Sequence, residues 1–528
     1  MVRLADQLLP GQFRKKPIYL IVAIFLFFYL AYELAQLVLS GNLIELALIG
    51  LLFVVFAFLL SILKNWRRGC YLFLGWLMFE DLVRKYLGNN MAIYFGKDLL
   101  LAVVYLSFFL AYRRKEVSGF RPPFQMALLL FVWFGIIQVF NPGSPSLFFG
   151  VLGVKIYFYY IPLIIIGHAL IRSEQDLIKF FSFCMLVLII IGSLGIVQAI
   201  LGHTFLNPEH PQEDIRELSQ GYRAAPISGV IVYRPTSVFV SNGRFAFYLL
   251  PAWLMAFGFS GYVILRKYRD RKLPIIALGV ASVATVLTSS RGSLLWTSGS
   301  LLVASAAFLW GAPWRQGEVV RVIRTLGRAL IAGAISFGLI LAIYPSAVND
   351  RLALYWETLN PWNSNSELYQ RTNSYPLQNF MYAFQYPRWP YGYGIGTSTL
   401  GIQYIQHILH VQPLPNYVES GYGGLVLELG IVGLILWLIM TAAIVLSAWR
   451  VVVKLRGSPL FPIGFVIFWF ALLLLFPETY AGLQTYQDFV LNAHLWLLLG
   501  VLFRLPKLVA SSKSGVATAG NQPLRTFR

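Results

Sequence analysis

Long apolar runs separated by short polar connections fill most of the chain. Residues 18–39 and 43–63, for example, are each long enough for the roughly 20-residue helix that crosses a bilayer. Lipid offers no partners to backbone polar groups, so such runs must be helical. The run at 69–83 is the weakest, because Glu80 and Asp81 interrupt it. The pattern predicts an all-α, polytopic integral membrane protein with twelve to fourteen transmembrane helices. The fourteen apolar spans are 18–39, 43–63, 69–83, 92–112, 124–141, 147–171, 177–201, 244–265, 273–290, 293–312, 329–345, 421–448, 459–477 and 485–504.

Composition and charge agree with this prediction. Of the 528 residues, 58% are hydrophobic and only 12% are charged, whereas soluble domains carry about 25% charged residues. In a soluble protein the net charge of +20 would suggest nucleic acid, but here the basic residues follow the topology. With the N-terminus inside, 30 of the 42 Lys and Arg residues fall on the cytoplasmic side. The positive-inside rule therefore predicts that both termini are cytoplasmic, and no nucleic-acid partner is expected.

Two long segments, about 202–243 and 346–420, are predicted to face away from the cytoplasm. Loops of this length usually serve a function. The whole of 1–510 is expected to form one transmembrane domain that carries these loops. Residues 511–528 are rich in Ser, Gly and basic residues, which predicts a disordered cytoplasmic tail.

The two external loops contain arginine but no lysine. A guanidinium group grips phosphate or carboxylate oxygens in pairs, whereas an ammonium group is a point charge. The bias therefore favours a phosphate or diphosphate ligand. The alternative is that these arginines pair with loop carboxylates or anchor the loops to lipid headgroups. The arginines in or beside the loops are Arg216, Arg223, Arg234, Arg244, Arg291, Arg351, Arg371 and Arg388.

Arg291 stands out within this group. It lies at a tight external turn that interrupts the apolar run 273–309. Ionisable residues at membrane depth are costly and are usually functional. The alternative for Arg291 is an interfacial anchor. Lys155, in the outer half of its span, is a further candidate for the same cavity.

The end of the second loop carries candidate acid–base residues. A glycine turn at 390–397 permits close backbone approach, and an amphipathic helix with His407 and His410 on its polar face is expected at 401–411. Glu419 lies where the chain re-enters the membrane, and a carboxylate there can accept a proton from a hydroxyl. His410 is the alternative base. The competing interpretations are a favourable helix N-terminal charge for Glu419 and solvated histidines on the polar face.

The external loops lack the motifs of metal and nucleotide sites. They contain no Asp-x-Asp, no Walker-type glycine loop and no paired Cys/His motif. No metal and no cofactor is therefore expected. Arginines would have to carry the counter-charge of any bound diphosphate.

The order of short motifs between residues 150 and 450 resembles the O-antigen polymerase and O-antigen ligase superfamily, which includes exopolysaccharide polymerases. Each motif is degenerate, and their order is the specific part; the first 120 residues contribute only hydrophobicity. The motifs are Gly153-Val154-Lys155 followed by Tyr157 to Pro162, Arg234-Pro235-Thr236-Ser237 leading to Ser241-Asn242, Ser290-Arg291-Gly292, the Arg371 region, Gly394-Ile395-Gly396, and the re-entry from Glu419 to Gly430.

The resemblance implies a metal-independent, inverting glycosyltransferase of the bacterial inner membrane. Its substrate would be an oligosaccharide on a polyprenyl diphosphate such as undecaprenyl diphosphate, used on the external face for O-antigen, lipopolysaccharide or exopolysaccharide. Glu419, Arg291 and Arg371 would be catalytic, with Glu419 as the general base. The diphosphate would be bound by Arg291 and Arg371 together with Arg234, Arg244 and Lys155. Expected partners are the lipid-linked glycan, membrane lipid, and a chain-length regulator or other polysaccharide-export protein.

One departure from the family pattern favours a polymerase over a ligase. Ligases place a histidine just before the re-entering span, but residues 415–419 contain none, and Glu419 resembles the glutamate of polymerase-like members. A ligase that moves lipid-linked glycan to another acceptor remains the alternative enzyme. A transporter of lipid-linked glycan or small anions is the alternative class, although no internal repeat typical of transporters is found.

Overall fold

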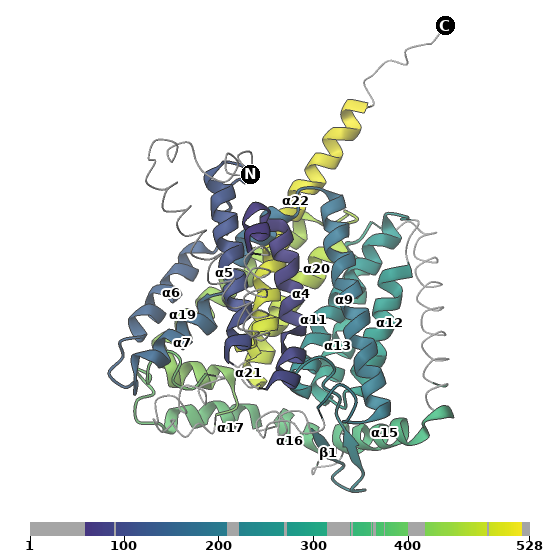
Figure 1. Ribbon diagram of the computed structural model, residues 1–528. Helices are drawn as coiled ribbons and strands as arrows, with labels where there is room; N and C mark the ends of the chain where they lie inside the picture. Colours follow the sequence, from purple (N-terminus) through teal and green to yellow (C-terminus); the bar gives the residue numbers. More distant parts are fainter. Residues whose placement is uncertain are drawn as a thin grey trace, which may run out of the picture.

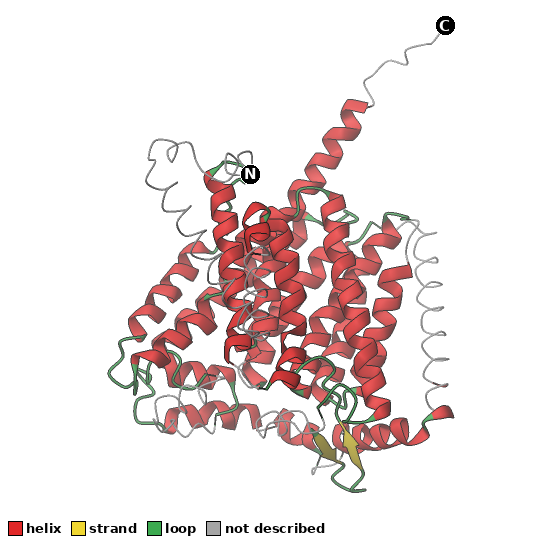
Figure 2. Ribbon diagram, viewed as in Figure 1, coloured by secondary structure: helices red, strands yellow, loops and turns green. Residues whose placement is uncertain are grey.

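The computed structural model describes most of the chain from residue 59 to residue 519. The residues outside the described part are 1–58, 89–90, 209–220, 269–271, 314–337, 339–341, 361, 363–365, 374, 400–417, 483–484 and 520–528. The described residues are mostly helical (Figure 2), and a single two-stranded antiparallel sheet is present among them. The predicted all-α fold is therefore confirmed.

Within the described ranges, eight helical segments are long and apolar enough to cross a membrane. The chain is thus a multi-pass membrane protein. Six of these segments are α5 (Met91–Arg113), α9 (Glu174–Leu201), α11 (Asn242–Leu265), α13 (Arg291–Gly311), α19 (Gly421–Lys454) and α22 (Phe489–Ala519). The other two are α7 (Leu147–Phe158) continued by α8 (Leu163–Leu170), and α20 (Phe461–Leu473) continued by a π-helical turn (Leu474–Glu478) and α21 (Thr479–Ala481).

The remaining predicted spans divide into three groups. The runs at 124–141 and 273–290 form shorter apolar helices, α6 (Gln125–Gln138) and α12 (Lys272–Leu287). The weak run at 69–83 forms a 22-residue helix, α4 (Trp66–Leu87). The run at 18–39, nearly all of 43–63 and most of 329–345 lie outside the described residues. The count of fourteen spans therefore stays a prediction.

Glycine packing sets how closely the helices approach one another. α22 packs along α8, where a Cβ atom on Gly500 would lie 2.1 Å from the Ile164 carbonyl oxygen. A Cβ atom on Gly167 would lie 2.1 Å from the Leu497 oxygen. Small residues of this kind allow backbones to touch where the hydrophobic effect is weak. α11 lies at the centre of the bundle and contacts α9, α12, α13 and α20.

Both long loops cover the same end of the bundle. The first loop contributes the hairpin of β1 (Tyr222–Ala224) and β2 (Ile231–Tyr233), and the second contributes α15 (Pro345–Leu359), α16 (Glu367–Asn373) and α17 (Tyr375–Tyr382). These elements form a layer across one end, while the C-terminal end of α22 leaves from the opposite end (Figure 1). α22 runs to Ala519, into the segment that the sequence predicts as a tail.

Candidate functional site

A network of buried charges lies in the half of the bundle nearest the loops. Asp81 of α4 accepts hydrogen bonds from Arg84 at 3.0 Å and from Arg244 of α11 at 2.8 and 3.0 Å. Glu80 pairs with Lys97 of α5 at 3.0 Å. The two acids that weaken the span in the sequence are therefore buried and paired, which is the condition under which charges persist in a membrane.

The ring of Tyr94 lies at the centre of this network. The cationic groups of Arg84, Lys97 and Lys155 lie 5.2, 3.6 and 4.5 Å from its centroid. Aromatic rings attract cations through their quadrupole, most strongly away from water. The network as a whole contains five basic side chains, Arg84, Lys85, Lys97, Lys155 and Arg244, and four acidic ones, Glu80, Asp81, Asp98 and Asp488.

Two residues predicted to bind diphosphate belong to this network. Lys155 forms an ion pair with Asp98 at 2.6 Å. Arg244 is held between Asp81 and Asp488, the latter at 3.8 Å. Both side chains are partly exposed, at 18% and 26%. Their charges are thus already balanced by acidic partners, which the sequence analysis did not identify.

A second group of basic side chains lies near enough to Tyr355 of α15 for their charges to act on its hydroxyl. Burial raises the pKa of the Tyr355 phenol, while the positive charges of Arg351, Arg234 and Arg291 act to lower it. Arg291 is the first residue of α13, after the N-cap Ser290, and its side chain is largely buried. The positive charges of Arg234 and Arg291, both predicted to bind diphosphate, therefore act on the same tyrosine of α15.

Arg351 has a structural role within this group. Its Nε donates to the Leu287 carbonyl at 3.1 Å, and its Nη2 donates to the carbonyls of Ala199 and Tyr233 at 3.2 and 3.0 Å. These carbonyls lie at the ends of α12 and α9 and in β2. One buried guanidinium therefore joins both external loops to the bundle, and burial lowers its pKa.

Arg371 and Glu419 meet on the exposed face of the loop layer. The Arg371 guanidinium lies 4.9 Å from the ring centroid of Tyr375, and the Tyr375 hydroxyl donates a hydrogen bond to the Glu419 carboxylate. The backbone N–H of Glu419 donates to Asn379 Oδ1 at 2.9 Å. Burial and the bond to Glu419 raise the pKa of Tyr375, so its hydroxyl stays protonated and donates. Arg371 and Glu419 are both exposed.

The glycine turn at 390–397 approaches protein backbone closely. α19 is broken at Gly430, whose φ is +70°, and the freed carbonyls of Leu427 and Glu428 accept bonds from the N–H groups of Tyr393 at 2.7 Å and Gly394 at 2.9 Å. Gly396 packs against α7, where a Cβ atom would lie 1.9 Å from the Phe149 oxygen. The turn thus satisfies the carbonyls freed by the break in α19 and packs against α7 at the same time.

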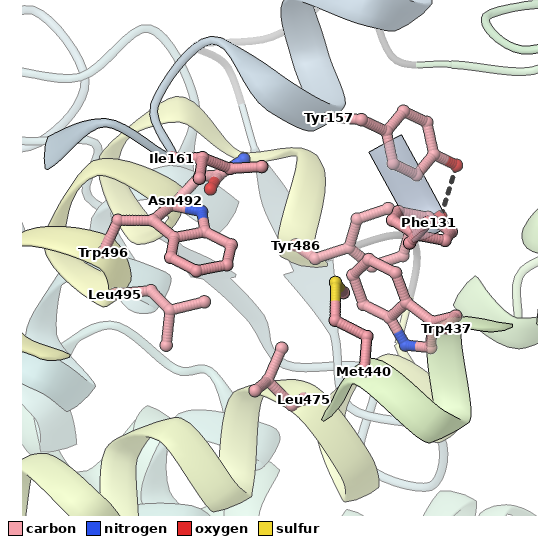
Figure 3. Close-up of a pocket in the computed structure, with 10 residues that line it drawn as sticks. All are labelled: Phe131, Tyr157, Ile161, Trp437, Met440, Leu475, Tyr486, Asn492, Leu495 and Trp496. Atoms are coloured by element: carbon pink, nitrogen blue, oxygen red, sulfur yellow. Dashed lines mark hydrogen bonds between the residues drawn. The ribbon is translucent and has the colours of Figure 1, made fainter. Parts of the chain in front are cut away.

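A small aromatic pocket lies inside the bundle, between residues of α6, α7, α19 and α22 (Figure 3). The Tyr157 and Tyr486 hydroxyls are hydrogen-bonded at 2.9 Å, and Trp437 lies beside them. The volume open to the centre of a water molecule is about 20 Å³, which is room for about one water. The pocket is therefore too small to hold a sugar.

Several predicted features lie outside the described residues. They are His407 and His410 with their helix at 401–411, and Arg216 of the first loop. Among the residues that the structure describes, no group of three or more His, Cys, Asp or Glu side chains forms a potential metal site. Sequence reasoning missed the network acids Asp98 and Asp488, although charges beside apolar runs could have drawn attention to them.

The comparisons with known proteins add no relative: no known protein family matches the sequence, and neither does any characterised protein.

Proposed function

We propose that the chain polymerises oligosaccharide repeat units that are linked to a polyprenyl diphosphate. The observation that carries the proposal is the contact of Arg371 and Glu419 through Tyr375 on the exposed loop face. A group that binds an anionic leaving group and a group that accepts a proton then lie within reach of one substrate. The loop-covered end would face outwards in a bacterial inner membrane, with both termini in the cytoplasm.

The proposed reaction is a single displacement. An acceptor hydroxyl attacks the anomeric carbon, Glu419 takes the hydroxyl proton, and the bond from the anomeric carbon to the diphosphate breaks with its electron pair on the leaving oxygen. Arg371, together with Arg234 and Arg291, would stabilise the charge that develops on the diphosphate. Tyr375 would orient the Glu419 carboxylate.

Conservative substitutions test these roles in membranes that carry equal amounts of protein. Arg371→Lys and Arg291→Lys keep the charge but lose the paired N–H donors of the guanidinium, so polymer formation should fall by about tenfold or more. In Glu419→Gln, polymer formation should fall by about 10²–10⁴-fold. Arg388→Lys, in an exposed arginine of the same loop, is the matched control and should retain activity. Wild-type yields from both Arg291→Lys and Arg371→Lys would refute the diphosphate role.

Deletion of the protein separates polymerase from ligase. Loss of long chains with accumulation of single lipid-linked repeats indicates a polymerase, whereas accumulation of long lipid-linked chains indicates a ligase. The base is tested by comparing Glu419→Gln with His410→Gln. Normal polymer from Glu419→Gln together with inactive His410→Gln would remove Glu419 from its role and favour the ligase.

A second candidate, a transporter of lipid-linked glycan or of a small anion, is favoured by two observations. The buried pairs Glu80–Lys97 and Asp81–Arg244 resemble the charges that line transport pathways, and α19 is a broken helix. Purified protein in liposomes distinguishes the two classes. Movement of lipid-linked glycan between leaflets without chain extension supports transport, whereas chain extension without such movement supports the polymerase.

A further inference from the structure

The short segment that follows Arg234 is held by buried polar side chains from two distant helices. Lys85, near the end of α4, donates hydrogen bonds to Thr236 Oγ1 at 2.8 Å and to the Ser237 carbonyl at 2.7 Å. Gln198 Oε1, near the end of α9, accepts from the backbone N–H groups of Thr236 at 2.9 Å and Ser237 at 2.6 Å. We call this arrangement the 236–237 clamp.

The clamp holds a backbone conformation that a serine rarely adopts. Ser237 has a φ of +52°, which costs a residue with a Cβ atom free energy and persists only where the surroundings fix it. The Ser237 hydroxyl also donates to the Ile191 carbonyl at 2.7 Å. Lys85 and Gln198 are 2% and 0% exposed, so the bonds are shielded from competing water.

Arg234 lies directly between this clamp and a second anchor. Its own N–H donates to the Gly221 carbonyl at 2.9 Å, and the carbonyl of Tyr233 accepts from Arg351. The backbone is therefore fixed on both sides of Arg234, while its side chain is half-buried near Tyr355. A guanidinium that must bind a diphosphate in one geometry is better positioned when the backbone that carries it is fixed.

We propose that Lys85 is a positioning residue, which acts through Thr236 and Ser237 to present Arg234 to the substrate diphosphate. This inference rests on the proposed function. Lys85 itself points to protein atoms and touches no substrate. Its ammonium replaces the water that would otherwise bond to the Thr236 hydroxyl and the Ser237 carbonyl, so its loss frees the segment to sample other conformations.

The test combines amide hydrogen exchange with steady-state kinetics on the full chain. Lys85→Met removes the N–H donors but keeps a side chain of similar length. Thr236→Val removes one acceptor of the clamp, so it tests the same contact if Lys85→Met does not fold. In both variants, exchange at residues 236–237 should rise by about tenfold or more, while exchange in α20 stays unchanged. In both variants the KM for lipid-linked repeat units should rise by about tenfold, with a smaller change in kcat. In Lys85→Arg, which keeps a charged donor at this position, the rise in KM should be smaller.

The matched control is Lys267→Met, at an exposed lysine just beyond the C-terminal end of α11, which should change neither measurement. Faster exchange at 236–237 with unchanged KM and kcat would overturn the positioning role while polymerase activity stands. Unchanged exchange in both variants would overturn the clamp itself. If the wild type forms no polymer, the proposed function fails, and binding of undecaprenyl diphosphate then decides the role of Lys85: equal affinity in the wild type and Lys85→Met overturns it.

Discussion

Replacement of Arg351 by methionine should detach α15 from the bundle without unfolding the bundle. The guanidinium makes three hydrogen bonds of 3.0 to 3.2 Å to backbone carbonyls, and the residue is only 4% exposed. A hydrogen bond from a charged donor contributes about 1.5–3 kcal/mol, so the three together contribute roughly 4–9 kcal/mol. Methionine has a similar length but no donor, and it leaves all three carbonyls without this partner.

The loss is comparable with the apolar contribution to α15 docking. Val348, Leu354 and Tyr355 are buried in the described part of α15, at 2%, 0% and 6% exposed, and each contributes about 1.5–3 kcal/mol when fully buried. Without Arg351 these contacts must also offset the unsatisfied carbonyls. Undocking limits the total cost, because water then reaches the carbonyls. We therefore expect α15 to open while the transmembrane helices stay folded.

Hydrogen exchange of peptides that span residues 345–359 measures this opening. Exchange in Arg351→Met should rise by about hundredfold or more, since a change of about 3 kcal/mol corresponds to more than a hundredfold in the opening equilibrium. Arg351→Lys keeps the charge and some donors and should give an intermediate rise. Asn349→Ala, at an exposed position of the same helix, is the control. Exchange in Arg351→Met that matches this control would refute the reasoning.

Two further predictions concern the glycine turn and the hairpin. Gly396→Ala should lower the midpoint of thermal unfolding in detergent by more than Gly457→Ala does. Both glycines have positive φ, but only a Cβ atom at 396 would meet backbone, the Phe149 oxygen at 1.9 Å. Equal decreases in the midpoint would show that the positive φ alone, and not the close contact, accounts for the destabilisation. The Glu357 carboxylate accepts hydrogen bonds from Ser228 and its neighbour in the β1–β2 turn, and these bonds lower its pKa below the ordinary 4.5. The stabilisation is thus present above that pH and lost as pH falls through the lower folded value. Protection of the amides in this turn, measured relative to their intrinsic exchange rates at each pH, should therefore fall on acidification in the wild type but not in Glu357→Gln.

The sequence predicted the helical membrane fold because apolar length is a local property. Judged by local hydrophobicity alone, α4 was the weakest predicted span. Glu80 and Asp81 lower the hydrophobicity of this run, and the sequence does not show which residues pair with them. The ion partners Lys97 and Arg244 lie 17 and 163 residues away from them. Only the assembled bundle shows that these charges are balanced, so a count of charges in a window underestimates such a helix.

The candidate site was predictable by residue type and only partly by arrangement. The external arginines and Glu419 could be selected from their place in the loops. Their sorting into groups depends on tertiary structure. Tyr375 connects Arg371 to Glu419, the charges of Arg234 and Arg291 act on Tyr355, and Arg244 pairs with Asp81 of α4 and with Asp488, which directly precedes α22. Whether the side chains within each group bind diphosphate stays a prediction.

The break in α19 constrains how the protein can be assembled during synthesis. A helix that enters the bilayer with the Leu427 and Glu428 carbonyls free would carry unsatisfied polar groups into lipid, at a cost of several kcal/mol for each. The donors that satisfy them, Tyr393 and Gly394, are synthesised earlier, as is the α7 surface at Phe149 that receives Gly396. Because of this order along the chain, the donors and the packing surface that α19 needs are already synthesised when that helix leaves the ribosome.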